Sequence, residues 1–225
     1  MIAVTSLAPG HKNKDNQKKA IQSWKDAGFT VYSINSIEEV SLLQEYQVEF
    51  VMTTQSGQDI YGKPYVKLDA FRDFIKEYGD ALILNSDILI TGDIKAAIEK
   101  SKEGALILNR YDYDEDLSKY KIFKSGFDAF YITKKVAQIL PDTKLALGQC
   151  HWDYWLPMVL IMNSVRIFTS KNVLIMHKKH DLQYNLASWE KTGQIFCREL
   201  GLKGNERYES MRAHMKINAM ITPVW

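Results

Sequence analysis

The segment Ala81–Asp93 (ALILNSDILITGD) joins an apolar strand to polar groups that could bind a metal or a phosphate. Its first four apolar residues lead directly into Asn85, Ser86 and Asp87. Open α/β sheets bind ligands at the carboxyl ends of their strands, so a carboxylate at this point indicates a binding site. The alternative is an ordinary turn, because Asn and Asp often hydrogen-bond to nearby backbone in turns.

A second carboxylate, Asp153, stands among aromatic residues in the sequence QCHWDYWLP. Partial burial against rings would raise the pKa of Asp153 and suit it to take a proton from an attacking hydroxyl. The flanking Trp152 and Trp155 could offer their faces to a sugar ring and so bind an acceptor. The alternative is an aromatic core cluster in which Asp153 caps the helix that follows.

Two histidines, His177 and His180, follow the apolar run VLIM. One imidazole could complete a metal site begun by Asp87, since divalent cations accept mixed oxygen and nitrogen ligands. Neither cysteine partners nor the glutamate of an HExxH motif accompany them, which argues against structural or proteolytic zinc. A lone histidine is more often an ordinary surface or core residue.

The segment GFDAFYITKK has the composition of a strand. Alternation divides its side chains into two faces, with Phe127, Ala129 and Tyr131 on one and Asp128, Phe130 and Ile132 on the other. Asp128 could contact a substrate hydroxyl or cap a turn, and Gly126 could admit a ligand or bend the strand. Lys67 begins a predicted helix, where it could face a diphosphate or form solvated salt bridges.

Two other patterns resemble known ligand loops and fail in detail. Gly57, Gly62 and Lys63 have the GxxxxGK spacing of a P-loop, but Pro64 replaces the hydroxyl residue that would hold magnesium, so a glycine-containing turn is expected. The acidic run YDYDED starts like an EF-hand at Asp112, but the later Gly and Glu positions are filled by other residues. A solvated acidic loop is the expected structure there.

The composition is that of one folded domain without a dominant charge. The 225 residues are 46% hydrophobic, include 26 aromatic residues and carry a formal charge of +2, so no global field indicates nucleic acid or an anionic surface as partner. Two cysteines outside any CxxC pair fit a reduced compartment. The first residues lack the pattern of a signal peptide, and no apolar run is long enough to cross a membrane. A cytoplasmic protein is therefore expected.

Apolar strands and amphipathic helices alternate along the chain, which predicts βαβ units and a largely parallel sheet. Ser36 and Glu39 have capping-box spacing at the start of one helix. Strands are expected at 1–8, 29–35, 48–54, 81–87, 105–110 and 126–133, and helices at 17–27, 36–46, 66–79 and 94–100. Val159–Phe168 and Val173–Met176 are expected to finish the sheet, and the chain from Leu182 onward to be helical.

In its order of motifs, the chain resembles the GT-A glycosyltransferases over roughly residues 1–181. LILNSDILITGDI looks like the segment with their DxD motif, with Asn85 where the first Asp usually stands and Asp87 matching the last. GFDAFYI looks like their acceptor-side strand. Asp153 falls where inverting members carry their catalytic carboxylate, and His177 is similar to the late histidine that joins the metal in several such families.

The resemblance implies an α/β fold with a single GT-A-like, Rossmann-like domain over 1–181 and a mixed, mostly parallel central sheet. Residues 182–225, which the resemblance does not cover, are expected to form C-terminal helices packed on the same domain. It implies transfer of a sugar from a nucleotide-diphosphate donor, UDP-sugar above all, to a hydroxyl acceptor, with Asp153 as general base. A divalent cation, Mn²⁺ or Mg²⁺, would be held by Asp87 and His177, although the uncharged Asn85 weakens the expected affinity for it. The implied donor-binding residues are Thr5, Ser6, Pro9, Asn35, Lys67, Asn85 and Ser86, and the implied acceptor-binding residues are Asp128, Trp152 and Trp155.

Several alternatives stay open. The acceptor could be a glycan, a lipid-linked glycan, a protein, or a hydroxylated DNA base as in phage-type glycosyltransferases, and the mild basicity of the chain does not favour DNA. A nucleotidyltransferase of the same fold fits poorly, because SLAPGHKNK lacks the expected glycine-rich basic loop. A non-catalytic module that binds a nucleotide or a sugar is the alternative from another class.

Overall fold

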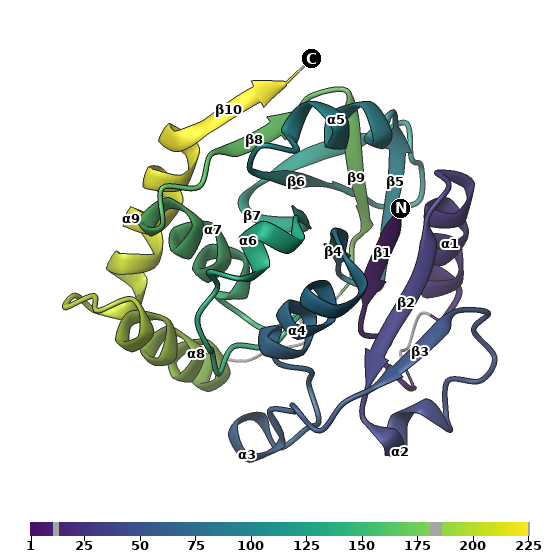
Figure 1. Ribbon diagram of the computed structural model, residues 1–225, viewed down its shortest axis with the longest axis horizontal. Coiled ribbons are helices and arrows are strands. Elements are labelled where there is room, and N and C mark those ends of the chain that lie inside the picture. Colours follow the sequence, from purple (N-terminus) through teal and green to yellow (C-terminus); the bar gives the residue numbers. More distant parts are fainter. Residues whose placement is uncertain (11–13, 181–185, 225) are drawn as a thin grey trace.

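The computed structural model describes residues 1–10, 14–180 and 186–224 of the chain. Strands and helices alternate through its first half, as predicted (Figure 1). The strands are β1 (Ile2–Thr5), β2 (Thr30–Asn35), β3 (Glu49–Met52), β4 (Ala81–Leu84), β5 (Ile88–Gly92), β6 (Ala105–Tyr113), β7 (Tyr120–Ile132), β8 (Ile167–Ser170), β9 (Val173–Lys178) and β10 (Ile221–Val224). The helices are α1 (Lys14–Asp26), α2 (Ile37–Val40), α3 (Gln58–Tyr61), α4 (Leu68–Tyr78), α5 (Ile94–Ser101), α6 (Lys134–Ala137), α7 (Trp152–Met162), α8 (Leu186–Glu199) and α9 (Glu206–Met220).

The strands form one mixed sheet in the order β10-β8-β6-β7-β4-β1-β2-β3, and β9 pairs with both β5 and β6. Among the described strands, six of the nine pairings are parallel. The antiparallel pairs are those of β7 with β4 and β6 and of β5 with β9. The predicted fold class is therefore confirmed: a single α/β domain of Rossmann-like type, with a mixed, mostly parallel, curled sheet and C-terminal helices.

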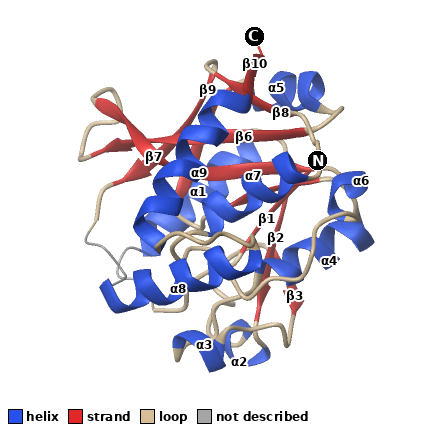
Figure 2. Cartoon of the chain, turned by 90° about the vertical axis from the view of Figure 1, so that its left-hand side faces the viewer, coloured by secondary structure: helices blue, strands red, loops and turns tan. Residues whose placement is uncertain are grey.

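Two apolar cores cover the two faces of the sheet. Strand β4 shows the division, because Ala81 and Ile83 join the core under α4, α7 and α9, whereas Leu82 and Leu84 join the core under α1 and α5. Helices α7, α8 and α9 lie together on one side of the molecule (Figure 2). A strand that is buried on both faces needs an apolar side chain at every position, which explains the continuous ALIL run.

The prediction that Val159–Phe168 finishes the sheet is wrong over most of its length. Val159 to Met162 belong to helix α7, and only Ile167 and Phe168 enter a strand, β8. The residues of α7 from Trp155 to Leu160 are all buried. A run that is apolar on every side has no period that distinguishes a buried helix from a buried strand, so the sequence pattern misleads here.

The C-terminal segment is not purely helical. Helices α8 and α9 pack on the core through Phe196, Ala213 and Ile217, and Ile221–Val224 then adds β10 to the edge of the sheet beside β8. Pro223 within this strand suits an edge position, because proline cannot donate to a further strand. The predicted boundary between residues 181 and 182 lies outside the described residues.

Local signals account for two of the short helices. The hydroxyl of Ser36 accepts a hydrogen bond from the backbone N–H of Glu39, which confirms the predicted cap, but α2 ends at Val40 and does not continue to residue 46. Helix α3 ends at Gly62, whose φ of 70° is left-handed. This geometry confirms a glycine-containing turn in place of a P-loop. None of the helices in the described ranges is both long enough and apolar enough to cross a bilayer.

Candidate active site

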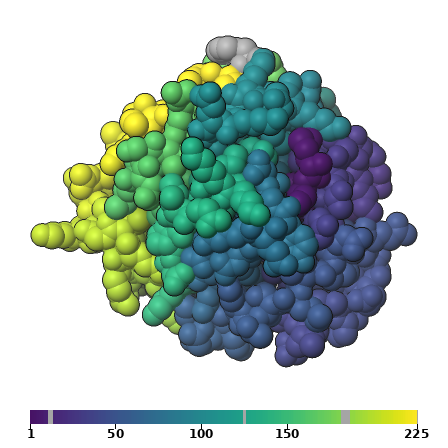
Figure 3. Space-filling view, in the orientation of Figure 1, coloured from purple at the N-terminus to yellow at the C-terminus, as the bar shows by residue number. Residues whose placement is uncertain are grey.

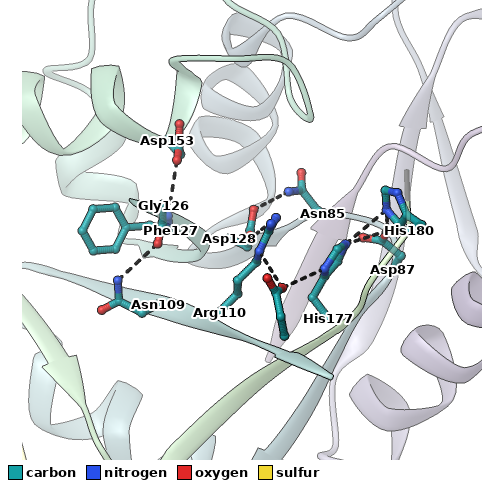
Figure 4. A network of polar contacts seen from close by, with 11 residues as sticks. Asn85, Asp87, Asn109, Arg110, Gly126, Phe127, Asp128, Asp153, His177 and His180 are labelled. Atoms are coloured by element: carbon teal, nitrogen blue, oxygen red, sulfur yellow. Dashed lines mark hydrogen bonds and ion pairs between the residues drawn. The ribbon is translucent and has the colours of Figure 1, made fainter. Parts of the chain in front are cut away.

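The polar residues highlighted by the sequence meet where β4, β6 and β9 end (Figure 4). Strand β9 lies between β5 and β6, and its residue His177 pairs with Ile88 on one side and Asp112 on the other. Asp87 directly precedes Ile88 in the chain. The register of the sheet therefore brings the carboxylates of Asp87 and Asp112 to the two sides of the His177 imidazole.

Asp87, His177 and His180 direct three possible ligand atoms toward one position. Nε2 of His180 lies 3.2 Å from Nε2 of His177 and 3.2 Å from Oδ2 of Asp87. Oδ2 of Asp87 lies 3.5 Å from Nε2 of His177. Ligand atoms held about 2.0–2.2 Å from one metal ion are about 3.0–3.5 Å from one another. The spacing of this triad therefore fits a single metal ion.

The second nitrogen of His177 is held by a carboxylate, since its Nδ1 lies 3.0 Å from Oδ1 of Asp112. Such a contact fixes the tautomer and the orientation of a metal-binding imidazole. Burial alone would lower the pKa of His177, but its hydrogen bonds to Asp112 and Asp87 outweigh burial and raise that pKa to about 9. Burial would raise the pKa of Asp87, but the two imidazoles hold it far below its usual range.

Arg110 and Asp128 connect this triad to the rest of the site. The Arg110 guanidinium forms ion pairs with Asp112 at 3.0 Å and with Asp128 at 3.2 Å, and it stacks 4.0 Å from the ring centroid of Phe123. The amide nitrogen of Asn85 donates to Oδ1 of Asp128 at 2.6 Å. The amide oxygen of Asn85 is buried and has no hydrogen-bond partner among the described residues, so it can accept a hydrogen bond from a ligand.

A β-bulge directs Asp128 into the site. Leu108 of β6 pairs with Ala129, whereas the next residue, Asn109, pairs with Phe127, so Asp128 has no partner in the ladder. Phe127 consequently lies in the same core as Phe130, and the predicted strict alternation of this strand is wrong at Phe127. Bulges of this kind often lie next to active sites, where they reorient one side chain.

Asp153 lies in the first turn of α7 and faces the same bulge. Its Oδ2 accepts a hydrogen bond from the backbone N–H of Phe127 at 3.3 Å. Burial raises the pKa of Asp153, and the neighbouring charge of Asp128 raises it further, to about 7. A carboxylate with a pKa near neutrality can accept a proton from a substrate hydroxyl and later release it to water.

Gly126 makes room for this carboxylate. A Cβ atom at position 126 would lie 2.9 Å from Oδ2 of Asp153 and 3.0 Å from Cε1 of Phe123, so a larger side chain forces one of them to move. We expect Gly126→Ala to lower the free energy of unfolding by about 1–3 kcal/mol, as overpacking does elsewhere. Denaturant melts of Gly126→Ala, Asp153→Gly and the double variant measure the effect. If Gly126→Ala lowers the free energy of unfolding by the same amount with and without the Asp153 side chain, this explanation is wrong.

The other residues predicted to bind the donor or the acceptor differ in how far they are exposed to solvent. Thr5 is fully buried and its hydroxyl donates to the Leu84 carbonyl. Asn35 is fully buried and donates to the Leu7 carbonyl. Trp152 and Trp155 are each 2% exposed within the core, so neither presents a face to a sugar. The partly exposed residues of the set are Ser6, Pro9, Lys67 and Ser86.

The structure adds Arg110 and Asp112 to the predicted site residues, and it brings both His177 and His180 to the triad, where the sequence predicts one imidazole. Arg110 and Asp112 stand two residues apart near the end of a strand, so they share one face of it. That spacing is a usable signal, but the acidic composition of the YDYDED run predicts a solvated loop. The structure shows instead that β6 continues through Asp112 to Tyr113.

No protein-family model matches the chain, and no curated protein matches it by sequence. Several solved structures have a similar backbone fold. One is a protein assigned as a glucose-1-phosphate thymidylyltransferase from Bacillus anthracis, in complex with sucrose, which is 14% identical over 92% of this chain and 98% of that one, with a TM-score of 0.41. HddC from Yersinia pseudotuberculosis, complexed with GMP-PN, is similar at 12% identity over 84% and 96% of the two chains, with a TM-score of 0.41. TarS from S. aureus is similar at 11% identity over 97% of this chain and 43% of its own length, with a TM-score of 0.48. These TM-scores lie below 0.5, and we base no functional conclusion on them.

Proposed function

We propose that this chain is a metal-dependent glycosyltransferase that moves a sugar from a nucleotide-diphosphate donor, with a UDP-sugar as first choice, to a hydroxyl acceptor. The observation that supports the proposal is a chain of polar contacts that runs from the Asp87–His177–His180 triad through Asp112 and Arg110 to Asp128. The residue before Asp128, Phe127, donates its backbone N–H to Asp153. These contacts join a set of possible metal ligands to a carboxylate whose pKa is near neutrality. Both are needed when a sugar leaves a diphosphate and a hydroxyl attacks it.

The donor set of the triad favours Mn²⁺ over Mg²⁺. Two imidazole nitrogens and one carboxylate oxygen form a mixed set, whereas Mg²⁺ prefers oxygen ligands and retains water. The three ligand atoms come from Asp87, His177 and His180 alone, whereas Asn85 donates its amide N–H to Asp128 and keeps its amide oxygen unpartnered among the described residues. The absence of a charge at position 85 therefore does not weaken the triad itself.

The charges around the site give the cation a second role. The site holds four carboxyl groups, those of Asp87, Asp112, Asp128 and Asp153. Against them stand the Arg110 guanidinium, which pairs with Asp112 and Asp128, and the His177 imidazole, which contacts Asp87 and Asp112. An anionic diphosphate would be repelled by such a surface. A divalent cation held by the triad would offset this charge and stabilise the negative charge that develops on the leaving diphosphate.

Asp153 is the proposed general base. The backbone N–H groups of Phe127 and of Asp153 itself hold its carboxylate, which would accept a proton from the acceptor hydroxyl through a remaining lone pair. Attack on the face of the sugar opposite to the diphosphate would invert the anomeric carbon. The unpartnered oxygen of Asn85 and the partly exposed Ser6 and Ser86 are the proposed contacts to donor hydroxyls.

The proposal is tested by thermal-shift measurements with a panel of nucleotide sugars, each with Mn²⁺, with Mg²⁺ and with chelator. A ligand that binds the folded state raises the melting temperature by mass action. We expect one nucleotide-sugar class to raise it only with Mn²⁺, and slow release of the free nucleoside diphosphate to follow. A chain that binds nucleotide sugars but never releases the diphosphate, with any acceptor class offered, would be a binding module instead.

We expect Asp112→Asn to weaken Mn²⁺ binding by about 10–100-fold, because an amide holds the His177 imidazole less firmly than a carboxylate does. Titration calorimetry with Mn²⁺ measures the change. The matched control is Asp114→Asn, since Asp114 is two residues away, is exposed and forms an ion pair with Lys179. Equal affinities of the two variants would exclude a supporting role for Asp112.

A further inference from the structure

The outer face of helix α9 carries large apolar side chains that nothing in the described structure covers. Tyr208, Met211 and Met215 are 51%, 56% and 65% exposed. At 100° per residue they fall within a single narrow stripe along the helix. We call Tyr208, Met211, Met215 and their basic neighbours Arg207, Arg212 and Lys216 the α9 surface. In Figures 2 and 3 helix α9 lies on the outside of the molecule.

The charges of the α9 surface all have one sign. Arg207 borders the apolar stripe on one side, and Arg212 and Lys216 border it on the other; all three are exposed. Glu209 is 5% exposed, accepts from the Gly204 N–H and pairs with Arg212 at 3.4 Å, which partly offsets the charge of Arg212. Glu206, the other acidic residue of the helix, packs against Gly193. An apolar stripe between two basic margins is the pattern of a helix that lies in a membrane interface.

A groove of about 280 Å³ opens beside this stripe. Its apolar lining comes from Met158 of α7 and from Leu202, Ala213 and Met215, and its polar lining comes from the Glu209–Arg212 ion pair and from Lys216. The unbranched, polarizable thioethers of the two methionines adapt to irregular apolar partners. The groove is therefore suited to an acyl chain, with the basic margin close to the headgroup.

We propose that the α9 surface docks on an anionic lipid bilayer. The charge complementarity and the flat arrangement of the stripe between its basic margins favour a bilayer, where long basic side chains reach headgroups while methionine and tyrosine enter the interface. A nucleic acid would match the basic residues but would leave the methionines exposed to water. This docking is independent of the glycosyltransferase proposal, since it uses none of the residues of the Asp87–Asp153 network.

Vesicle sedimentation tests the proposal, with phosphatidylcholine vesicles and with vesicles that also contain phosphatidylglycerol, at low and high salt. We expect binding to the anionic vesicles that falls as salt rises. The double variant Met211→Gln, Met215→Gln and the double variant Arg207→Gln, Lys216→Gln should each bind about tenfold more weakly. The matched control is Met52→Gln, because Met52 is 63% exposed but lies on β3 at the far edge of the sheet.

Four results would overturn the proposal. The chain could fail to bind anionic vesicles, or the α9 variants could bind as well as the Met52 control while melting at the same temperature. Sedimentation velocity could show a dimer that the Met211→Gln, Met215→Gln variant loses, which would make the α9 surface an interface between two copies. Tighter binding to duplex DNA than to anionic vesicles, lost in the Arg207→Gln, Lys216→Gln variant, would assign the surface to nucleic acid.

Discussion

Asp153→Asn is expected to lower kcat by about a thousandfold while donor binding stays unchanged, within the range by which general bases accelerate reactions. The amide keeps the shape of the side chain, and its oxygen can still accept the Phe127 N–H. It has no basicity, however, so the acceptor hydroxyl keeps its proton. Turnover of the nucleotide sugar found by thermal shift, together with its dissociation constant, measures the two quantities separately. An unchanged kcat would remove Asp153 from the mechanism.

The same variant gives a readout that needs no substrate. Burial and the charge of Asp128 raise the pKa of Asp153 to about 7, so the folded state binds a proton more tightly than the unfolded state does. Such a group reduces stability as pH rises from its unfolded pKa to its folded pKa. We therefore expect Asp153→Asn to melt at a higher temperature than the wild-type chain at about pH 8, with the gain shrinking toward pH 5.

The pH profile of the wild-type enzyme follows from the same group. A base with a folded pKa of about 7 is mostly protonated in acid, so kcat/KM should rise through neutrality and level off above it. Burial and the charge of Asp128 raise the pKa of Asp153, whereas the N–H groups of Phe127 and Asp153 and the charge of Arg110 lower it. Removing the Asp128 charge with Asp128→Asn should therefore move the rise to lower pH.

The strand that leads to the site was predictable from sequence because its burial and its ending are both local properties. The ALIL run must be buried on both faces, and the polar residues that follow it must then lie at the edge of the sheet. The pairing of Asp87 with His177 is not local. It depends on β9 entering the sheet between β5 and β6, and no pattern in either segment specifies that neighbour.

The bulge at Asp128 and the burial of the tryptophans show a second limit of prediction from sequence, which is the direction of single side chains. Period-two alternation predicts which side chains share a face only while the ladder is regular, and the extra residue of β7 breaks that rule. Trp152 and Trp155 flank Asp153 in sequence, but a helix turns neighbouring side chains in different directions. Both rings therefore enter the core, while the carboxylate faces the bulge.

Asp87→Ala is expected to abolish Mn²⁺ binding and to lower kcat by about a thousandfold, because metal ions supply several kcal/mol of charge stabilisation in such reactions. The triad would lose its only carboxylate, and two imidazoles without it hold a divalent cation weakly. Titration calorimetry and the Mn²⁺-dependent rise in melting temperature measure the binding, and Asp114→Ala is the exposed control. Treating the wild-type chain with chelator should reproduce the loss of turnover, and Mn²⁺ should restore it in the wild-type chain but not in Asp87→Ala. If Asp87→Ala instead keeps full turnover in the presence of chelator, the reaction does not need a cation. Arg110 would then be the group that stabilises the negative charge of the leaving diphosphate.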